Sequence, residues 1–165
     1  MARIFSEPRI VVREPCNVVG AYCTFEGDSE PWGDASRMLD QRKHEIRNRK
    51  NDAVLGFLYR PHTDHPDIPE NVRACFMGVE VVNFQDVPAG LATTRFTGGE
   101  YVVMECRGDT RDEAAMGIGE AVDRLTRWIK EHGYRIGDAC FECSHESMAG
   151  PPYREYVYIR ILREA

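Results

Sequence analysis

Short runs in which apolar and polar residues alternate make up most of this chain, and two longer stretches carry apolar residues at helical spacing instead. Runs rich in valine and aromatic residues predict strands at 9–15, 17–25, 52–60, 72–82, 90–96, 100–108, 138–145 and 154–162. One helical stretch interrupts each group of four strands after its second strand. The pattern therefore predicts a unit of strand, strand, helix, strand and strand that occurs twice, with a period of about 80 residues.

The first helical stretch follows the strand at 17–25. Its apolar residues fall on one face: Trp32, Ala35, Met38, Leu39 and Ile46. Asp28 or Ser29 can cap this helix, and Pro31 suits its first turn. The basic segment "RNRK" at 47–50 is predicted to continue the helix as a solvated end.

The second helical stretch, 110–133, has the clearer signals. Thr110 and Glu113 have the spacing of a capping box, and Gly133 suits the C-terminal end. The predicted buried stripe consists of Ile118, Ala121, Val122, Leu125, Trp128 and Ile129.

These elements predict an α+β fold in which each unit forms a small antiparallel sheet with its helix on one face. We expect a single domain over residues 1–165, with one repeat at about 8–83 and a second at about 84–163. Two such units side by side would enclose a central groove, which is a favourable place for a ligand.

Composition and charge limit the partners and the cellular location that we expect for the protein. Hydrophobic residues make up 42% of the 165 residues, and the formal net charge is −6. An acidic chain repels the phosphate backbone, and no helix-turn-helix segment is recognised, so direct binding to nucleic acid is not expected. The sequence shows neither an apolar run of membrane-spanning length nor a signal peptide, which predicts a cytoplasmic protein without membrane association.

The six cysteines do not predict a metal site. Without an export signal they are expected to be reduced, and Cys140 and Cys143 point to opposite faces of a strand, where they would chelate one ion poorly. His62, Asp64 and His65 lie in a proline-rich loop at 61–71, and we interpret them as solvated. No metal or cofactor is therefore expected.

One carboxylate stands out in the strand "GDACFECSHE". Glu142 shares a face with Cys140 and Ser144, whereas the opposite face carries Ala139, Phe141 and Cys143. If the Phe141 face packs under the second helix, Glu142 points into the groove. The alternative is a carboxylate that faces water on an exposed sheet.

Aromatic residues could line the same groove: Trp32, Tyr59, Phe76, Tyr101, Tyr156 and Tyr158. Rings around a carboxylate suit a flat cationic or amphipathic molecule, because the rings supply contact area and cation–π attraction and the carboxylate supplies the counter-charge. Each ring could equally belong to an ordinary core.

Several segments together resemble the GyrI-like small-molecule-binding domain, the effector-binding part of many AraC-type and MerR-type regulators, including multidrug-sensing ones. The similar segments are "EPRIVVREPCNVVG", "VRACFMGVEV", "VPAGLATTRFTGGEYVVMECRGD", "LTRWIKEHGY", "FECS" and "YREYVYIRI". The resemblance implies that Glu142 faces a central cavity and meets cationic ligands. Where the family often has Tyr two residues after this glutamate, the chain has Ser144.

Three functions follow, and we rank them in this order. The first is a stand-alone ligand-binding module, with Glu142 as the electrostatic anchor and with Tyr101, Trp32, Tyr59, Phe76 and Tyr158 as ligand-contacting rings. The second is a hydrolase of reactive small molecules in which Glu142 acts as acid or base, helped by a donor such as Tyr101. The third is an interaction module that contacts a topoisomerase or a regulator, as the gyrase-inhibiting members of the resembled family do.

Overall fold

The structure is a computed structural model that describes residues 4–59, 73–145 and 150–163. The chain forms two compact units, each described here by itself. Cys16–Arg95 make up one, called the 16–95 unit. Phe96–Ala165 together with Met1–Pro15 make up the other, called the 96–165 unit. The α+β class with antiparallel strands is confirmed, whereas the central groove stays a prediction.

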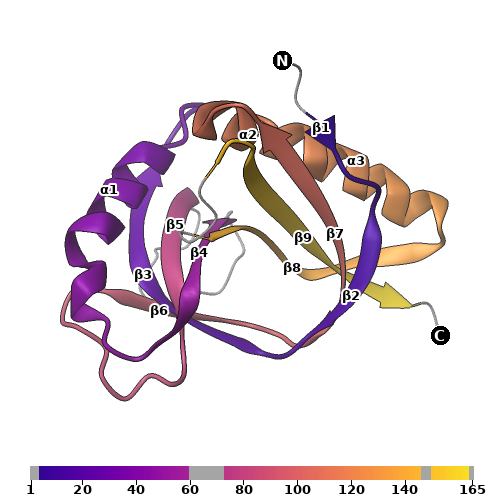
Figure 1. Cartoon of the computed structure of the whole chain (residues 1–165). Helices are drawn as coiled ribbons and strands as arrows, with labels where there is room; N and C mark the ends of the chain where they lie inside the picture. Colours follow the sequence, from indigo (N-terminus) through magenta and orange to yellow (C-terminus); the bar gives the residue numbers. More distant parts are fainter. Residues whose placement is uncertain (1–3, 60–72, 146–149, 164–165) are drawn as a thin grey trace. The chain divides into compact units, whose positions relative to one another are not determined.

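The 96–165 unit is an antiparallel sheet with two helices. Its elements are β1 (Ile4–Phe5), β2 (Arg9–Arg13), β7 (Gly99–Gly108), α2 (Arg111–Met116), α3 (Ile118–Glu131), β8 (Tyr134–His145) and β9 (Tyr153–Arg163). Strand β7 pairs with β1 and β2 along one edge and with β9 along the other, and β8 follows β9 (Figure 1). The predicted strand at 9–15 is therefore present, and it pairs with a strand that lies far along the chain.

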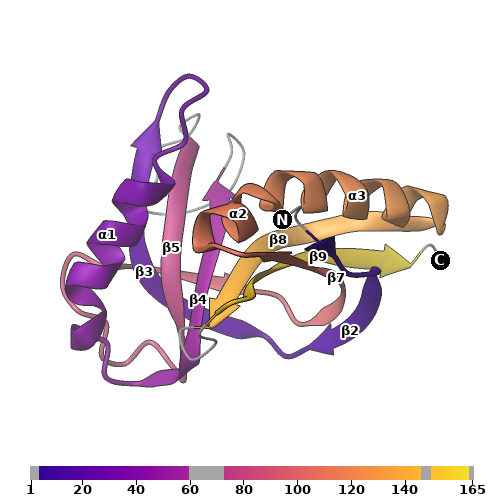
Figure 2. The same ribbon diagram turned by 45° about the horizontal axis from the view of Figure 1, so that its top comes forward.

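The predicted second helix is confirmed in extent but consists of two pieces. Thr110 and Glu113 form the full capping box at the start of α2, as predicted. Gly117 then separates α2 from α3, which lies along β8 and β9 (Figure 2). The buried stripe of α3 packs against the sheet core formed by Val102, Met104, Val157, Ile159 and Ile161.

Register fixes which face of this sheet each residue occupies, because residues directly opposite each other in an antiparallel pair project to the same side. Val102 lies opposite Ile159, and both pack against α3. We call this side the helix face. Phe141 lies opposite Tyr158, which alternates with the core residues of β9, so Phe141 projects to the other side. We call that side the aromatic face.

The expectation that the Phe141 face packs under the second helix is therefore wrong. Strand alternation places Glu142 and Phe141 on opposite faces, as predicted, but alternation alone does not say which of the two faces meets the helix. Both faces of this sheet bury apolar side chains, and Phe141 is only 2% exposed on the aromatic face. Glu142 instead shares the helix face with its partner Val157.

The 16–95 unit is also built from an antiparallel sheet and a helix. Its elements are β3 (Cys16–Phe25), α1 (Trp32–Arg42), a 3-10 turn (Lys43–Glu45), β4 (Arg49–Tyr59), β5 (Arg73–Val81) and β6 (Ala92–Phe96), with strand order β4-β5-β3-β6. The core consists of Val19, Leu39, Ile46, Val79 and Val81.

Two expectations about α1 are wrong. The helix begins after Pro31, and no side chain caps it, so neither Asp28 nor Ser29 serves as the cap. The basic segment at 47–50 does not extend the helix, because Arg49 already pairs with Val81 as part of β4. Pairing with a long neighbouring strand overrides the favourable helix propensity of Arg and Lys in this segment.

Two further features concern the cysteines and the hydrophobicity of the helices. All six cysteines are free thiols, with Cys140 exposed and Cys143 buried on opposite sides of β8 as predicted. Among the described residues, no helix is long and apolar enough to cross a membrane. A cytoplasmic location stays a prediction.

Candidate functional site

Glu142 lies in β8 on the helix face, opposite Val157. Val157 is 1% exposed because it packs in the core under α3, whereas Glu142 is only partly buried. Its same-face neighbours in β8 are Cys140, which is exposed, and Ser144, which is partly exposed. We call Cys140, Glu142 and Ser144 the β8 strip. It is a part of the helix face that a small molecule can reach.

A second carboxylate, Glu155, lies on the same face. Glu155 is two residues before Val157 in β9 and opposite Cys106 of β7. It is thus a diagonal neighbour of Glu142 across the β8–β9 pair, a position that typically separates Cα atoms by about 7–8 Å. Burial, and then the charge of Glu142, raise the pKa of Glu155 to about 8, and Arg111 opposes this shift. Glu155 therefore holds a proton at neutral pH.

The surroundings of Glu155 come from the start of α2. The guanidinium of Arg111 lies over the ring of Tyr153, with Cζ 5.2 Å from the ring centroid. Tyr153 is two residues before Glu155 and shares its face. The close approach of α2 to β7 depends on Gly108, where a Cβ would lie 2.6 Å from the backbone nitrogen of Ala114. The start of α2 thus brings the cation of Arg111, and β9 brings the ring of Tyr153, to the side of Glu155.

Sequence reasoning missed Glu155, although a signal for it was present. Strand alternation places position 155 on the same face as the apolar residues Val157, Ile159 and Ile161. A carboxylate in such a stripe is as unusual as Glu142 is in its own strand.

Tyr101 and Tyr158 lie together on the aromatic face, opposite to Glu142. The rings of Phe141 and Tyr158 stack with their centroids 4.9 Å apart, and Phe96 stacks on Phe141 at 4.6 Å. Tyr101 meets Phe141 edge-on at 5.7 Å, and its hydroxyl donates a hydrogen bond of 2.7 Å to the backbone oxygen of Thr97. Tyr101 is only 1% exposed, so it acts as a core residue here.

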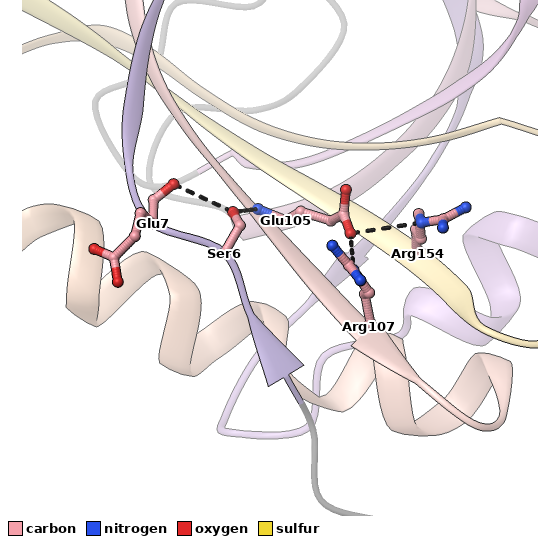
Figure 3. Close-up of polar contacts among 5 residues, drawn as sticks. All are labelled: Ser6, Glu7, Glu105, Arg107 and Arg154. Atoms are coloured by element: carbon pink, nitrogen blue, oxygen red, sulfur yellow. Dashed lines mark hydrogen bonds and ion pairs between the residues drawn. The ribbon is translucent and has the colours of Figure 1, made fainter.

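A charged cluster lies further along the aromatic face. The carboxylate of Glu105 pairs with Arg107 and with Arg154, whose Nε is 3.5 Å from Oε1 (Figure 3). The backbone N–H of Glu105 donates to Oγ of Ser6 at 2.8 Å, which fixes the N-terminal segment against β7. Burial, and then Glu105, raise the pKa of Tyr156. Tyr156 therefore belongs to this cluster.

The remaining predicted residues belong to the 16–95 unit. Phe76 is fully buried and stacks on Phe57 with 4.6 Å between centroids. Trp32 is partly exposed at the start of α1, and its Nε1 donates to Oε2 of Glu30 at 2.6 Å. The side chain of Tyr59 lies outside the described residues.

The predicted histidine-containing loop and His145 cannot be compared with the structure. His62, Asp64 and His65 lie outside the described residues, as does the side chain of His145. Within the part of the chain that the structure describes, no three metal-ligating side chains gather at one point.

The chain was compared with known families and solved structures. The family model for the GyrI-like small molecule binding domain matches residues 6–162. No curated protein sequence matches the chain.

Solved structures share the fold at low sequence identity. EcmrR, in a cryo-EM structure of the EcmrR–DNA complex in EcmrR-RPo, matches 97% of this chain with a TM-score of 0.64 and 9% identity. This chain spans 58% of the EcmrR chain. SAV2435 bound to tetraphenylphosphonium matches 95% of this chain and 94% of its own, with a TM-score of 0.64 and 14% identity. A hydrolase from Listeria innocua matches 94% and 92%, with a TM-score of 0.55 and 12% identity.

Proposed function

The chain belongs to the GyrI-like small molecule binding domain family, and from this premise we propose that it captures a cationic or amphipathic aromatic molecule at the β8 strip, with Glu142 as the electrostatic anchor. The observation that supports this most strongly is the position of Glu142. It is a partly exposed carboxylate directly opposite Val157, a core residue under α3.

The physical basis of the proposal is the weakly screened environment of the Glu142 carboxylate. A carboxylate at the edge of an apolar core attracts a cation more strongly than one in bulk water, because the surroundings screen the interaction less. An amphipathic ligand would also remove apolar surface from water as it binds beside the helix. Cys140 and Ser144 are small neighbours that leave space along the strip.

Glu155 adds to the proposal. At neutral pH it is protonated, because burial and the charge of Glu142 raise its pKa to about 8. A bound cation would offset that repulsion and draw the pKa of Glu155 down, so that a second negative charge could form beside the ligand.

One structural neighbour agrees with the proposed ligand class. SAV2435, which shares the fold at 14% identity, has been solved with tetraphenylphosphonium, an aromatic cation. This makes tetraphenylphosphonium the natural first probe for this chain.

The test is a calorimetric titration with tetraphenylphosphonium and with the uncharged triphenylphosphine oxide. Glu142→Gln should weaken the cation about tenfold and leave the neutral compound nearly unchanged, since one charge-assisted contact is lost. Glu120→Gln is the matched control, because Glu120 is an exposed carboxylate on α3 paired with Arg124. Equal weakening of both compounds, or none, would refute the anchor role.

A hydrolase is the second candidate, and the carboxylate pair is the observation that favours it. Two nearby carboxyl groups with different protonation states are the usual arrangement for acid–base chemistry. Glu142 would take a proton from the attacking water, and Glu155 would give its proton to the oxygen of a strained ring that opens. One structural neighbour carries the description of a hydrolase.

The two candidates separate in a single assay. Incubation with a lipophilic epoxide such as styrene oxide should yield the diol if the chain is a hydrolase, and no product if it only binds. If Glu142→Gln abolishes turnover while the epoxide still binds, the enzyme reading is correct.

A regulatory role is also proposed, through a partner protein. EcmrR appears in complex with DNA, and this chain matches only part of it. Ligand capture here would then be transmitted to a separate regulator. This role would be supported if such a regulator co-purified with the chain and if tetraphenylphosphonium changed the amount recovered.

A further inference from the structure

The aromatic face of the 96–165 unit carries a strong positive charge, although the whole chain has a net charge of −6. Register places five arginines on this face, from β2, β7 and β9: Arg9, Arg13, Arg107, Arg154 and Arg160. The same register places Glu105 there, and it pairs with Arg107 and Arg154. The face therefore has an excess of positive charge beside its rings.

We propose that Arg9, Arg13 and Tyr158 form a binding site for a flat aromatic carboxylate on the aromatic face, separate from the cation site proposed at Glu142. Arg9 lies opposite Val103, and Val103 lies opposite Tyr158, so the three positions form one row across β2, β7 and β9. Arg13 lies four residues further along β2 on the same face, opposite Gly99.

Arg13 contacts the Tyr158 ring, and register places Arg9 in the same row as Tyr158. The guanidinium carbon of Arg13 lies 4.6 Å from the centroid of the Tyr158 ring and 5.1 Å from that of Phe141. Burial raises the pKa of Tyr158, and the charges of Arg13 and, more weakly, Arg9 act to lower it. The hydroxyl keeps its proton at neutral pH and can donate it in a hydrogen bond.

Several arginines of the chain are paired with a carboxylate. Glu45 pairs with Arg42, Glu120 with Arg124 and Glu100 with Arg163. Among the carboxylates whose side chains the structure describes, none forms an ion pair with Arg9 or Arg13. A ligand carboxylate would supply that partner.

The chemistry of guanidinium defines the ligand. A guanidinium has five N–H donors in one plane and can hold a carboxylate through two parallel hydrogen bonds. The outer surface of the same plane can stack on a further aromatic ring. Tyr158 and Arg13 are partly exposed and Arg9 is exposed, so a ligand can reach all three. An added cation would be repelled here by the arginines.

The test uses 2-naphthoate as the probe and the uncharged 2-naphthamide as its match, in calorimetric titrations of the full chain. Arg13→Gln and Arg9→Gln should each weaken 2-naphthoate about tenfold, because a charged hydrogen-bond donor is lost. Arg13→Lys should fall between, since it keeps the charge but not the paired donors. Arg127→Gln on α3 is the control, because Arg127 is exposed on the helix side of the unit, and it should bind like the unaltered chain.

Several results would overturn the proposal. One is equal binding of 2-naphthoate and 2-naphthamide, and another is the absence of any effect of Arg13→Gln and Arg9→Gln. A third is that inorganic phosphate displaces the bound probe as effectively as naphthoate does, which would mean that the ring is not recognised. If Arg13→Gln fails to fold, salt serves instead: raising it from about 50 to about 500 mM should weaken naphthoate and not naphthamide. Tetraphenylphosphonium binding should be unaffected by the Arg9 change, which separates this site from the one at Glu142.

Discussion

Phe141 lies directly opposite Tyr158 on the neighbouring strand, and the two rings stack at 4.9 Å with an angle of 14° between their planes. This pairing decides the chemistry of the 96–165 unit. It commits Phe141 to the aromatic face and, by strand alternation, Glu142 to the helix face. The same register places Glu142 and Glu155 on the helix face and Arg9, Arg13 and Tyr158 on the aromatic face.

Removing the Phe141 ring should strongly destabilise the chain. Phe141 is 2% exposed and packs against Phe96, Tyr101 and Tyr158, so Phe141→Ala leaves a cavity that costs about 3–5 kcal/mol. Urea denaturation followed by circular dichroism measures this loss. Val12→Ala is the comparison, because Val12 is 77% exposed, and it should change stability by less than about 0.5 kcal/mol. Similar losses for both variants would contradict the packing described.

The stability of the folded chain should fall as the pH rises over the range in which Glu155 is protonated in the folded chain and deprotonated in the unfolded chain. In the unfolded chain a glutamate has a pKa of about 4.3, whereas burial and Glu142 raise the pKa of folded Glu155 to about 8. Between these values the folded state binds more protons, so each rise in pH favours unfolding until about pH 8.

Glu155→Gln should remove this slope. The difference in melting temperature between the variant and the unaltered chain should grow from pH 5 to pH 8 and then level off. Thermal denaturation across that pH range measures it. A constant difference would show that Glu155 titrates in its usual range.

The capping box should matter for stability, and the segment before α1 should not. Oγ1 of Thr110 accepts a hydrogen bond of 3.1 Å from the backbone N–H of Glu113, and losing such a cap costs about 1 kcal/mol. Thr110→Ala should therefore lower the unfolding free energy by about that amount. Ser29→Ala should have no measurable effect, since no side chain caps α1. The result fails if Ser29→Ala is the more harmful of the two.

Thiol labelling reports which face of β8 is accessible. Cys140 is exposed on the β8 strip, whereas Cys143 is 2% exposed on the aromatic face. Iodoacetamide under native conditions should modify Cys140 and spare Cys143, as measured by peptide mass spectrometry. Tetraphenylphosphonium should slow the modification of Cys140, because the ligand is proposed to lie along the same strip. Preferential labelling of Cys143 would reverse the assignment of the faces.

Much of the fold could be predicted from the sequence, because its signals are local. Alternation located the strands, and the Thr110 and Glu113 spacing located a helix start. The continuation of the first helix through 47–50 failed, because Arg49 is drawn into β4 by pairing with Val81, a partner far away in the sequence.

The site was harder to predict for the same reason. Alternation correctly separated Glu142 from Phe141, but only the register with β9 shows that Glu142 sits beside Val157 and therefore on the helix face. Glu155 and Glu142 lie on different strands, as do Arg13 and Tyr158. No residue spacing within one strand predicts that the two members of either pair are close together. Such pairs follow from strand register, which a single sequence does not specify.

The most direct test of the central claim is a crystal structure of the chain with tetraphenylphosphonium bound. Our account predicts the phosphonium beside the carboxylate of Glu142, with a phenyl ring along Cys140 or Ser144 of the β8 strip. Density for the cation among Arg13 and Tyr158 on the aromatic face, or with Glu142 turned away into solvent, would contradict it.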